Sequence, residues 1–263
     1  MTRTLKGKAA IVTGAGRGIG RGIAVELAKE GAQVVVASRS QSTVDRTVAE
    51  IAALGGSAIG ALCDVGDPEA IRDTVEAAVS AFGRLDILVN NAQSFGTLEH
   101  PTATPVLTPL ESFSDEEWGR TFQTGPTASY LFMKAAFPHL QASGSGRIIN
   151  FGSYWGQTGY AGSVAYNAAK EAIRGLTRTA AREWGQHGIT VNCINPALAS
   201  DALESFVRDH PSAAHEAMQH IPMRRYGDIF SDGGRIACFL AGPDAAFLTG
   251  MTFQVDGGLF MVP

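Results

Sequence analysis

The segment Thr13-Gly14-Ala15-Gly16-Arg17-Gly18-Ile19-Gly20 decides the fold. It joins a short apolar run, 9–12, to a stretch in which Ile19, Ile23 and Leu27 recur at helical spacing. Glycines between a strand and a helix let the backbone turn tightly and approach a pyrophosphate, whose charge the N–H groups at the helix N-terminus stabilise. The segment therefore predicts a dinucleotide-binding turn rather than a merely structural one. Its predicted cofactor contacts are Gly14, Arg17, Gly18, Ile19 and Gly20.

The alternation of short apolar runs and amphipathic stretches continues along the chain. Two of the predicted helices are 43–54 and 68–82, and six further strands are predicted at 34–37, 58–62, 85–89, 146–151, 190–194 and 252–255. Because these runs are apolar throughout, both faces of the sheet are predicted to be covered. With right-handed crossovers, the expected α/β fold is a Rossmann-type, doubly wound, seven-stranded parallel sheet flanked by helices on both faces. No linker interrupts it, so 1–263 is predicted to be a single domain.

The composition argues against several other classes of protein. Of 263 residues, 45% are hydrophobic and 17% charged, with 21 Lys+Arg against 25 Asp+Glu, so neither disorder nor affinity for nucleic acid is expected. Cys63, Cys193 and Cys238 are widely spaced and form no CxxC pair, which predicts buried, reduced thiols and no metal site. No apolar run reaches about 18 residues, so no membrane span is expected, and a cytoplasmic location is predicted.

The end of the second predicted strand bears on the choice between NAD and NADP. A carboxylate at this place accepts hydrogen bonds from the adenosine ribose, but this chain has Ser38 and Arg39. The planar fork of Arg39 and the Ser38 hydroxyl suit a 2′-phosphate, and Arg17 adds a second positive charge. The sequence therefore favours NADP(H), with a solvated surface role for Arg39 as the alternative. After the third strand, Asp64 and the adjoining Val65 are placed at the adenine, although Asp64 could equally cap its own loop.

Tyr166 and Lys170 are candidate catalytic residues. They are four residues apart in a predicted helix and so share a face, while Ser153 follows the strand that ends at 151. A phenol with a pKa near 10 is a poor acid–base catalyst at neutral pH, and a neighbouring ammonium is expected to lower that pKa. A serine hydroxyl beside it can hydrogen-bond a carbonyl oxygen as charge builds there. Taken singly, each residue could have a purely structural role: Tyr166 as a core aromatic, Lys170 as a surface charge and Ser153 as a helix cap.

Together these residues resemble the short-chain dehydrogenase/reductase family over nearly the full length of the chain. The resemblance is to its NADP-dependent members that are similar to 3-oxoacyl-acyl-carrier-protein reductases. The shared positions are Thr13-Gly14-x-x-x-Gly18-x-Gly20, Asn90-Asn91-Ala92, Ser153 thirteen residues before Tyr166, Tyr166-x-x-x-Lys170, Asn195-Pro196 and Asp256-Gly257-Gly258.

The resemblance implies hydride transfer between the nicotinamide C4 and a ketone or secondary alcohol. Tyr166 would be the general acid in reduction and the base in oxidation, Lys170 would also hold the nicotinamide ribose, and Ser153 would orient the substrate oxygen. The resemblance further implies a homotetramer, with a homodimer as the alternative. A supporting position is implied at Asn90, and further cofactor-binding positions are implied at Asn91, Tyr166, Lys170 and Pro196.

One departure from the family pattern concerns the fourth catalytic residue, an Asn seven positions after a Trp. Counted from Trp118, this position is Gly125, followed by Pro126. In the family the Asn helps to hold a water that links the lysine to solvent. Our hypothesis is that Pro126, which lacks an N–H, leaves the Phe122 carbonyl free to bind this water instead.

The two segments 93–114 and 197–232 follow strand ends and are predicted to be the substrate-site loops. Two further departures lie in them, because Gln93 and Ala197 stand where the family usually has glycine. The side chains of these loops predict a largely apolar pocket with one polar reacting centre, which fits a medium-sized cyclic, aromatic or β-keto substrate. Alternatively, half of the loop side chains could pack the loops against the body of the protein. The predicted pocket residues are Gln93, Phe95, Trp155, Tyr160, Leu198 and Phe206.

The predicted function is that of an NADP(H)-dependent oxidoreductase acting on a small-molecule ketone or secondary alcohol. One alternative is an NAD-dependent alcohol dehydrogenase. The other is a nonenzymatic nucleotide-binding sensor or partner protein, because a fold alone does not determine function. Retention of Ser153, Tyr166 and Lys170 favours an enzyme.

Overall fold

Strand β1 (Ala9–Thr13) lies inside a seven-stranded sheet whose order is β3-β2-β1-β4-β7-β8-β9. The computed structural model describes residues 4–102, 104–200, 203, 208, 215, 216 and 218–261. Every pairing between neighbouring strands of this sheet is parallel, as predicted. The remaining strands are β2 (Gln33–Ser38), β3 (Ser57–Leu62), β4 (Ile87–Asn90), β7 (Arg147–Phe151), β8 (Thr190–Pro196) and β9 (Thr252–Val255).

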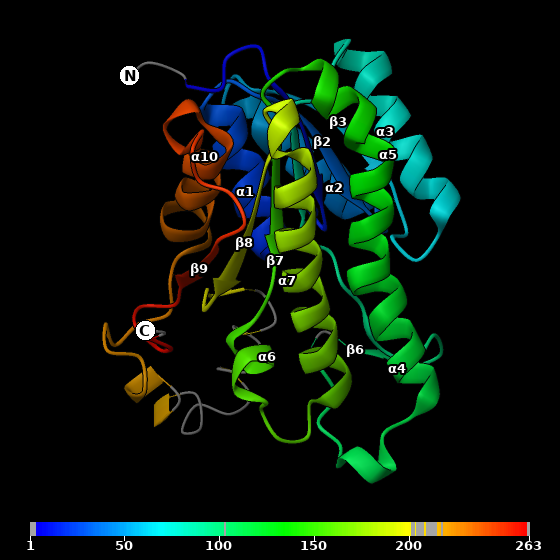
Figure 1. The fold of residues 1–263 in the computed structure, drawn as a ribbon, viewed down its shortest axis with the longest axis vertical. Coiled ribbons are helices and arrows are strands. Elements are labelled where there is room, and N and C mark those ends of the chain that lie inside the picture. The colour runs from blue at the N-terminus through cyan, green and yellow to red at the C-terminus, as the bar shows by residue number, and fades with distance from the viewer. Residues whose placement is uncertain are drawn as a thin grey trace.

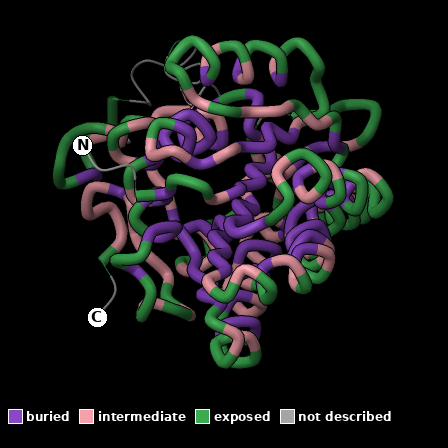
Figure 2. The backbone as a smooth tube through the Cα atoms, turned by 90° about the horizontal axis from the view of Figure 1, so that it is seen from above, coloured by how far each residue is buried: buried purple, intermediate pink, exposed green. Residues whose placement is uncertain are grey.

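Helices cover both faces of the sheet, so the single-domain Rossmann-type prediction is confirmed (Figure 1). One apolar core contains side chains of α1 (Gly18–Lys29), α2 (Gln41–Ala53) and α10 (Arg235–Ala241). The other contains side chains of α3 (Pro68–Phe82), α5 (Ala128–Ala142) and α7 (Val164–Trp184). Within β1, Val12 belongs to the first core and its neighbour Ile11 to the second, because successive strand residues point to opposite faces. Buried residues accordingly run through the centre of the molecule (Figure 2).

The ends of two helices show how the local sequence prepares the site. Helix α3 begins behind Asp67, whose carboxylate accepts a hydrogen bond from Glu69 N–H, and it ends at Gly83, which has a φ of 72°. Helix α1 begins differently, because its N-cap residue Arg17 makes no side-chain capping hydrogen bond. Within the described chain, the first-turn N–H groups of α1 therefore have no side-chain cap and point toward any ligand bound in front of them.

The first predicted loop, 93–114, contains structure that the sequence did not predict. A small hairpin pairs β5 (Phe95–Gly96) with β6 (Pro101–Thr102), and a 3-10 turn η1 (Leu110–Ser112) follows. Helix α4 (Asp115–Phe122) then continues through the π-helix η2 (Gln123–Thr127) into α5. Of the second loop, 197–232, residues 201, 202, 204–207, 209–214 and 217 lie outside the described part of the chain, including Phe206.

The shorter elements and the cysteines complete the description. Cys63, Cys193 and Cys238 are buried and unpaired, as their spacing predicts. In the residues described, no helix is long and apolar enough to cross a bilayer, and no group of three or more potential metal ligands occurs. The shorter elements are α6 (Tyr154–Thr158), η3 (Gly185–His187), η4 (Ile229–Gly234) and η5 (Pro243–Ala245).

Candidate active site

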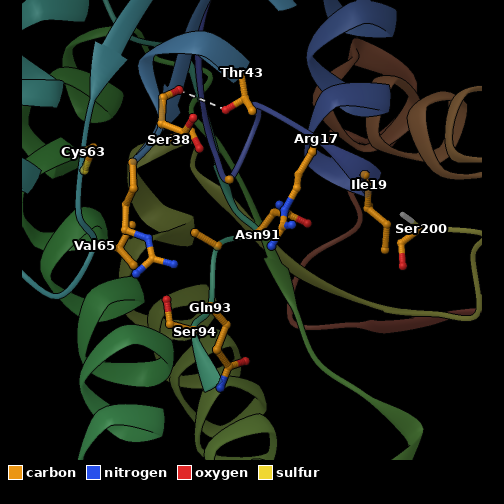
Figure 3. A pocket seen from close by; sticks show the side chains of 15 residues that line it. Arg17, Ile19, Ser38, Thr43, Cys63, Val65, Asn91, Gln93, Ser94 and Ser200 are labelled. Carbon is orange, nitrogen blue, oxygen red and sulfur yellow. Dashed lines mark hydrogen bonds between the residues drawn. The ribbon is translucent and has the colours of Figure 1, made fainter. Parts of the chain in front are cut away.

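A cleft of about 450 Å³ opens at the carboxyl ends of the strands (Figure 3). Parallel strands end at the same edge of a sheet, so loops that are distant in sequence meet here. The predicted cofactor residues that line it are Gly14, Arg17, Gly18, Ile19, Ser38, Arg39, Val65 and Asn91, and its other lining residues are Ser40, Thr43, Cys63, Ala92, Gln93, Ser94 and Ser200.

The glycine loop after β1 is shaped by close backbone contacts. Gly14 has a φ of 67°, and a Cβ there would lie 2.8 Å from the Asn91 side-chain nitrogen. A Cβ on Gly20 would overlap the carbonyl oxygen of Gly14. Asn91 holds the loop from the opposite side, because its side-chain N–H donates to the Thr13 carbonyl at 2.9 Å and its backbone N–H donates to the Thr13 hydroxyl at 3.0 Å. Side chains at both glycines would therefore close the turn in front of α1.

The two ends of the cleft are lined by different residues. Ser38 and Thr43 lie at one end, and Gln93 and Ser94 lie at the other (Figure 3). Arg39 is exposed beside Ser38, which leaves its guanidinium accessible to an anion.

Five predicted cofactor residues do not line this cleft: Gly20, Asp64, Tyr166, Lys170 and Pro196. Asp64 is exposed and its carboxylate accepts a hydrogen bond from Gly66 N–H at 2.9 Å, which is the loop-capping alternative. Pro196 is the last residue of β8, where it pairs with Val255 of β9.

Sequence reasoning missed Thr43 and Ser200 as cleft residues. Thr43 lies in the first turn of α2, and its hydroxyl donates to the Ser40 carbonyl at 2.9 Å. Its position one turn after Arg39 could have indicated it. Ser200 reaches the cleft from the second loop, and its Cβ lies 3.6 Å from where a Cβ on Gly18 would be. Nothing in its local sequence indicates that contact.

The structure brings Ser153, Tyr166 and Lys170 together. Ser153 is the N-cap of α6, accepts a hydrogen bond from Trp155 N–H at 3.2 Å, and also hydrogen-bonds the Tyr166 phenol. One turn further along α7, the buried Lys170 Nζ lies 5.4 Å from the centroid of the Tyr166 ring and donates to the Phe151 carbonyl at 2.9 Å. The serine thus serves both as a helix cap and as a neighbour of the phenol.

Burial dominates the proton affinities of this cluster. Burial lowers the pKa of Lys170 from 10.5 to about 8, because the ammonium loses its hydration. Burial also raises the pKa of Tyr166 above its ordinary value of 10, against the opposing effect of the Ser153 hydrogen bond. In the chain by itself, burial therefore outweighs any lowering of this pKa by the neighbouring ammonium, and the net shift is upward. The phenol is protonated at neutral pH, which is the form that can donate a proton.

Aromatic rings surround Tyr166. The ring of Phe95 meets the Tyr166 ring edge-on with centroids 5.5 Å apart, and that of Trp155 does so at 5.9 Å. Tyr160 stacks on Trp155 at 4.2 Å with an interplanar angle of 10°. These three predicted pocket residues therefore gather beside the phenol, as an apolar substrate site requires.

The other predicted pocket residues behave differently. Leu198 is 5% exposed and packs against Gly227 and Gly233, so it holds its own loop together. Gln93 lines the cleft of the glycine loop rather than the aromatic cluster. Phe206 lies outside the described residues.

A buried chain of amides ties the helix of Tyr166 and Lys170 to the sheet. Asn90 Nδ2 donates to Asn150 Oδ1 at 2.9 Å, and Asn150 Nδ2 donates to the Thr177 hydroxyl of α7 at 2.9 Å. Such a network fixes the position of α7 relative to β4 and β7. Asn90, for which the resemblance implies a supporting role, is the β4 member of this network.

Comparison with known proteins agrees with these features. A family model described as enoyl-(acyl carrier protein) reductase matches residues 14–260. The chain belongs to the short-chain dehydrogenase/reductase family. A 12alpha-hydroxysteroid dehydrogenase of Clostridium sp. is 34% identical over 264 residues, which cover 98% of each chain. A 3-oxoacyl-[acyl-carrier-protein] reductase of Vibrio cholerae is 36% identical over 258 residues, covering 98% of this chain and 99% of the relative.

A solved member of the family has nearly the same fold. It is assigned as an NAD(P)-dependent gluconate 5-dehydrogenase of Beutenbergia cavernae and contains NADP at low occupancy. The two structures match with a TM-score of 0.87 and 33% sequence identity, and the match covers 98% of this chain and 99% of that one. This short-chain dehydrogenase/reductase is thus related to oxidoreductases named for several different substrates. Membership gives the type of reaction and leaves the substrate open.

The family's Asn position is occupied by Gly125, inside the π-helix η2. In a π-helix each donor bonds the carbonyl five residues earlier, and Ala128 N–H accordingly bonds the Gln123 carbonyl. By the same pattern the Phe122 carbonyl faces Thr127 N–H, one residue past Pro126. The hypothesis that Pro126 leaves the Phe122 carbonyl free is therefore wrong, because the wider helix supplies another donor.

Proposed function

We propose that this chain is an NADP(H)-dependent oxidoreductase that transfers a hydride between nicotinamide and the ketone or secondary alcohol of a medium-sized, largely apolar substrate. The observation that carries the proposal is the cluster of Ser153, Tyr166 and Lys170 next to a cleft built by a glycine loop. When bound, the cofactor supplies or accepts the hydride at C4 of its nicotinamide ring.

The residues of the cleft fit a dinucleotide. Its volume of about 450 Å³ is in the range of small-molecule sites. Gly14 and Gly20 leave backbone space where a Cβ would collide, and α1 begins without a side-chain cap. These features suit a pyrophosphate at the N-terminus of α1.

The preference for NADP(H) is supported by the charge at the adenosine end of the cleft. Ser38 and Arg39 line this end, where a carboxylate would repel a 2′-phosphate, and Arg17 lines the same cleft. The bound NADP of the related solved structure agrees with this choice. Arg39 and Arg17 would pair with phosphate oxygens.

In the proposed reduction, the Ser153 hydroxyl hydrogen-bonds the substrate carbonyl and Tyr166 donates its proton to the same oxygen. Tyr166 enters this step as the protonated phenol, and burial keeps its pKa above the ordinary value of 10. The Lys170 ammonium, anchored on the Phe151 carbonyl, stabilises the phenolate that remains. In oxidation the same groups act in the opposite direction.

The proposed substrate class rests on the rings around Tyr166. Phe95, Trp155 and Tyr160 give this side of the site an apolar, flat surface suited to a cyclic or aromatic ketone. The relationship to a 12alpha-hydroxysteroid dehydrogenase supports a cyclic substrate, and that to a 3-oxoacyl-[acyl-carrier-protein] reductase supports a β-keto substrate.

The test combines nucleotide binding with turnover. NADPH and NADH are titrated by fluorescence, and cyclic, aromatic and β-keto ketones are then tested at the absorbance of the reduced nicotinamide. We expect NADPH to bind at least about tenfold tighter than NADH, with Arg39→Ala removing most of that difference. Tyr166→Phe is expected to lower turnover by about 10² to 10⁴-fold with NADPH binding within about threefold of wild type.

The control for Tyr166→Phe is Tyr130→Phe, which changes a tyrosine that is 47% exposed on α5. It is expected to have no effect on turnover. Binding of NADPH without reaction of any carbonyl or alcohol would refute the enzyme proposal and favour a nucleotide sensor. Tighter binding of NADH would refute the NADP(H) assignment alone.

We also infer that the chain works as a homotetramer or homodimer in the cytoplasm. Large apolar side chains are exposed in the segment that leads into the edge strand β9: Phe239 at 40%, Phe247 at 102% and Met251 at 52%. Surfaces of this kind are typical of subunit contacts, and three buried free thiols suit a reducing compartment. Light scattering during size-exclusion chromatography tests the assembly, and a monomer at micromolar concentration would contradict it.

A further inference from the structure

Gln93 and Gly125, which both depart from the family pattern, are in direct contact. A Cβ placed on Gly125 would lie 2.9 Å from Gln93 Nε2 and 3.3 Å from Gln93 Cδ. Side chains at the two positions would therefore compete for one space, and Gln93 occupies it. The side-chain amide in this space therefore comes from Gln93, in the loop after β4, and not from position 125 in the π-helix η2.

The Gln93 amide is only half satisfied by the protein. Its Nε2 donates to the Thr121 carbonyl at 3.4 Å, whereas its buried Oε1 has no hydrogen-bond partner among the residues described. A buried amide oxygen without a donor is unfavourable, because it has lost its hydrogen bonds to water and gained none from the protein. A buried acceptor of this kind is expected to receive its hydrogen bond from water or from a reacting group.

The Gln93 amide lies in the large cleft, and the residue that holds it, Thr121, also lies beside the phenol. Gln93 lies at the end of the cleft away from Ser38 (Figure 3). Thr121, whose carbonyl holds the amide, also lines a small cavity of about 10 Å³ together with Phe95 and Tyr166. A cavity of this size has room for about one water.

Lys170 has hydrogen-bond donors to spare on the neighbouring helix. Helix α7 packs against the π-helix that contains Gly125. The Lys170 ammonium carries three N–H groups, and Phe151 is its one hydrogen-bond acceptor within the described part of the chain. The helix that carries these spare donors thus packs against the π-helix whose Gly125 contacts the Gln93 amide.

We propose that Gln93 is a positioning residue whose Oε1 accepts a hydrogen bond from a water that passes protons between solvent and Lys170. This inference rests on the proposed ketone reduction. In that reaction the Tyr166 O–H bond breaks as its proton moves to the carbonyl oxygen. A proton of the Lys170 ammonium then passes to the phenolate, and the water passes a proton from solvent to the Lys170 amine. No group is oxidised or reduced in this relay. The amide that the family places at position 125 is thus supplied by position 93.

Exchange of the two residues tests the proposal. The variants are Gln93→Gly, Gly125→Asn and the double variant Gln93→Gly/Gly125→Asn. We expect Gln93→Gly to lower kcat by about 10 to 100-fold, within the range of proton-transfer effects, with KM and the Kd for NADPH within about threefold of wild type. Gly125→Asn alone is expected to lose activity and thermal stability, because its Cβ meets the Gln93 amide. The double variant is expected to recover both.

Chemical rescue separates proton transfer from a structural effect. Imidazole in solution should raise the kcat of Gln93→Gly toward wild type and leave wild type unchanged, because it carries protons in place of the positioned water. Gln93→Leu, which keeps the volume and removes the amide, should show the same loss and rescue. Gln123→Ala is the matched control, because it removes an exposed amide that bonds the Gly66 carbonyl.

The outcomes distinguish this inference from the proposed function. Wild type that binds NADPH but reduces no ketone would overturn both. Wild-type turnover with no loss in Gln93→Gly and Gln93→Leu would overturn the relay alone. A loss that imidazole does not rescue, or a double variant no better than Gly125→Asn in kcat and melting temperature, would also overturn it.

Discussion

Replacement of Lys170 by methionine is expected to abolish turnover and to stabilise the fold at neutral pH. Burial lowers the pKa of Lys170 from 10.5 to about 8, which at about 1.4 kcal/mol per pH unit corresponds to about 3 kcal/mol spent on holding the ammonium in the folded chain. Methionine removes this cost but leaves the Phe151 carbonyl without its donor, at about 1–3 kcal/mol. The net gain in the free energy of unfolding at pH 7 is about 1 kcal/mol.

The pH dependence gives this prediction its sign. The unfolded chain holds the lysine proton more tightly than the folded chain does, so the stability of wild type rises with pH between about 8 and 10.5. Lys170→Met lacks this rise. The free energy of unfolding of Lys170→Met relative to that of wild type is therefore expected to fall by about 2 kcal/mol between pH 7 and pH 9.5. At pH 9.5 wild type is then the more stable protein.

Urea unfolding at the two pH values, at matched protein concentration, measures the difference. Lys134→Met is the control, because Lys134 is exposed on α5 and its substitution should give the same difference at both pH values. The reasoning would be refuted if the difference between wild type and Lys170→Met also stayed constant with pH.

Two further substitutions test the fold at the two ends of the sheet, Gly20→Ala in the glycine loop and Asp86→Asn just before β4. Gly20→Ala is expected to destabilise the chain by about 1–3 kcal/mol and to weaken NADPH binding, because the new Cβ overlaps the Gly14 carbonyl. Thermal melting and NADPH titration measure the two effects, and Gly175→Ala, whose Cβ would have nothing within 4 Å, is the control. Burial raises the pKa of Asp86, but the Arg84 side chain, Ala9 N–H and Lys8 together hold it below 3.8. Its contribution to stability is thus present above pH 3.8 and lost as the pH falls through the folded value. Asp86→Asn should cost about 2 kcal/mol at pH 7, converging with wild type in acid unfolding; a constant gap down to pH 2 would contradict this.

Much of the fold could be predicted because its signals are local. The bounds of α3 match the prediction, since Asp67, Pro68 and Gly83 mark its two ends. Strand ends were less predictable, because neighbouring strands extend them: β8 runs two residues beyond the expected 190–194, and its last residue, Pro196, pairs with Val255. The hairpin of β5 and β6 has two residues in each strand, too few to show any alternation.

The candidate site divides in the same way. Tyr166 and Lys170 could be placed together because one helix carries both of them. The contact of Gln93 with Gly125 joins a loop to a helix 32 positions away, and no local pattern encodes it. The net pKa shift of Tyr166 could not be predicted, because the sequence shows the neighbouring charge but not the burial that outweighs it.

The uncapped start of α1 makes the nucleotide part of the folding equilibrium. The backbone N–H groups that Arg17 leaves without a side-chain cap are satisfied by whatever anion binds in front of the helix. A ligand present at about one hundred times its Kd adds about 2.7 kcal/mol to the stability of the chain that binds it. The fraction of unfolded chains open to proteolysis then falls about a hundredfold. We therefore expect the lifetime of this protein to depend on the supply of the nucleotide, with faster proteolysis where the nucleotide is scarce.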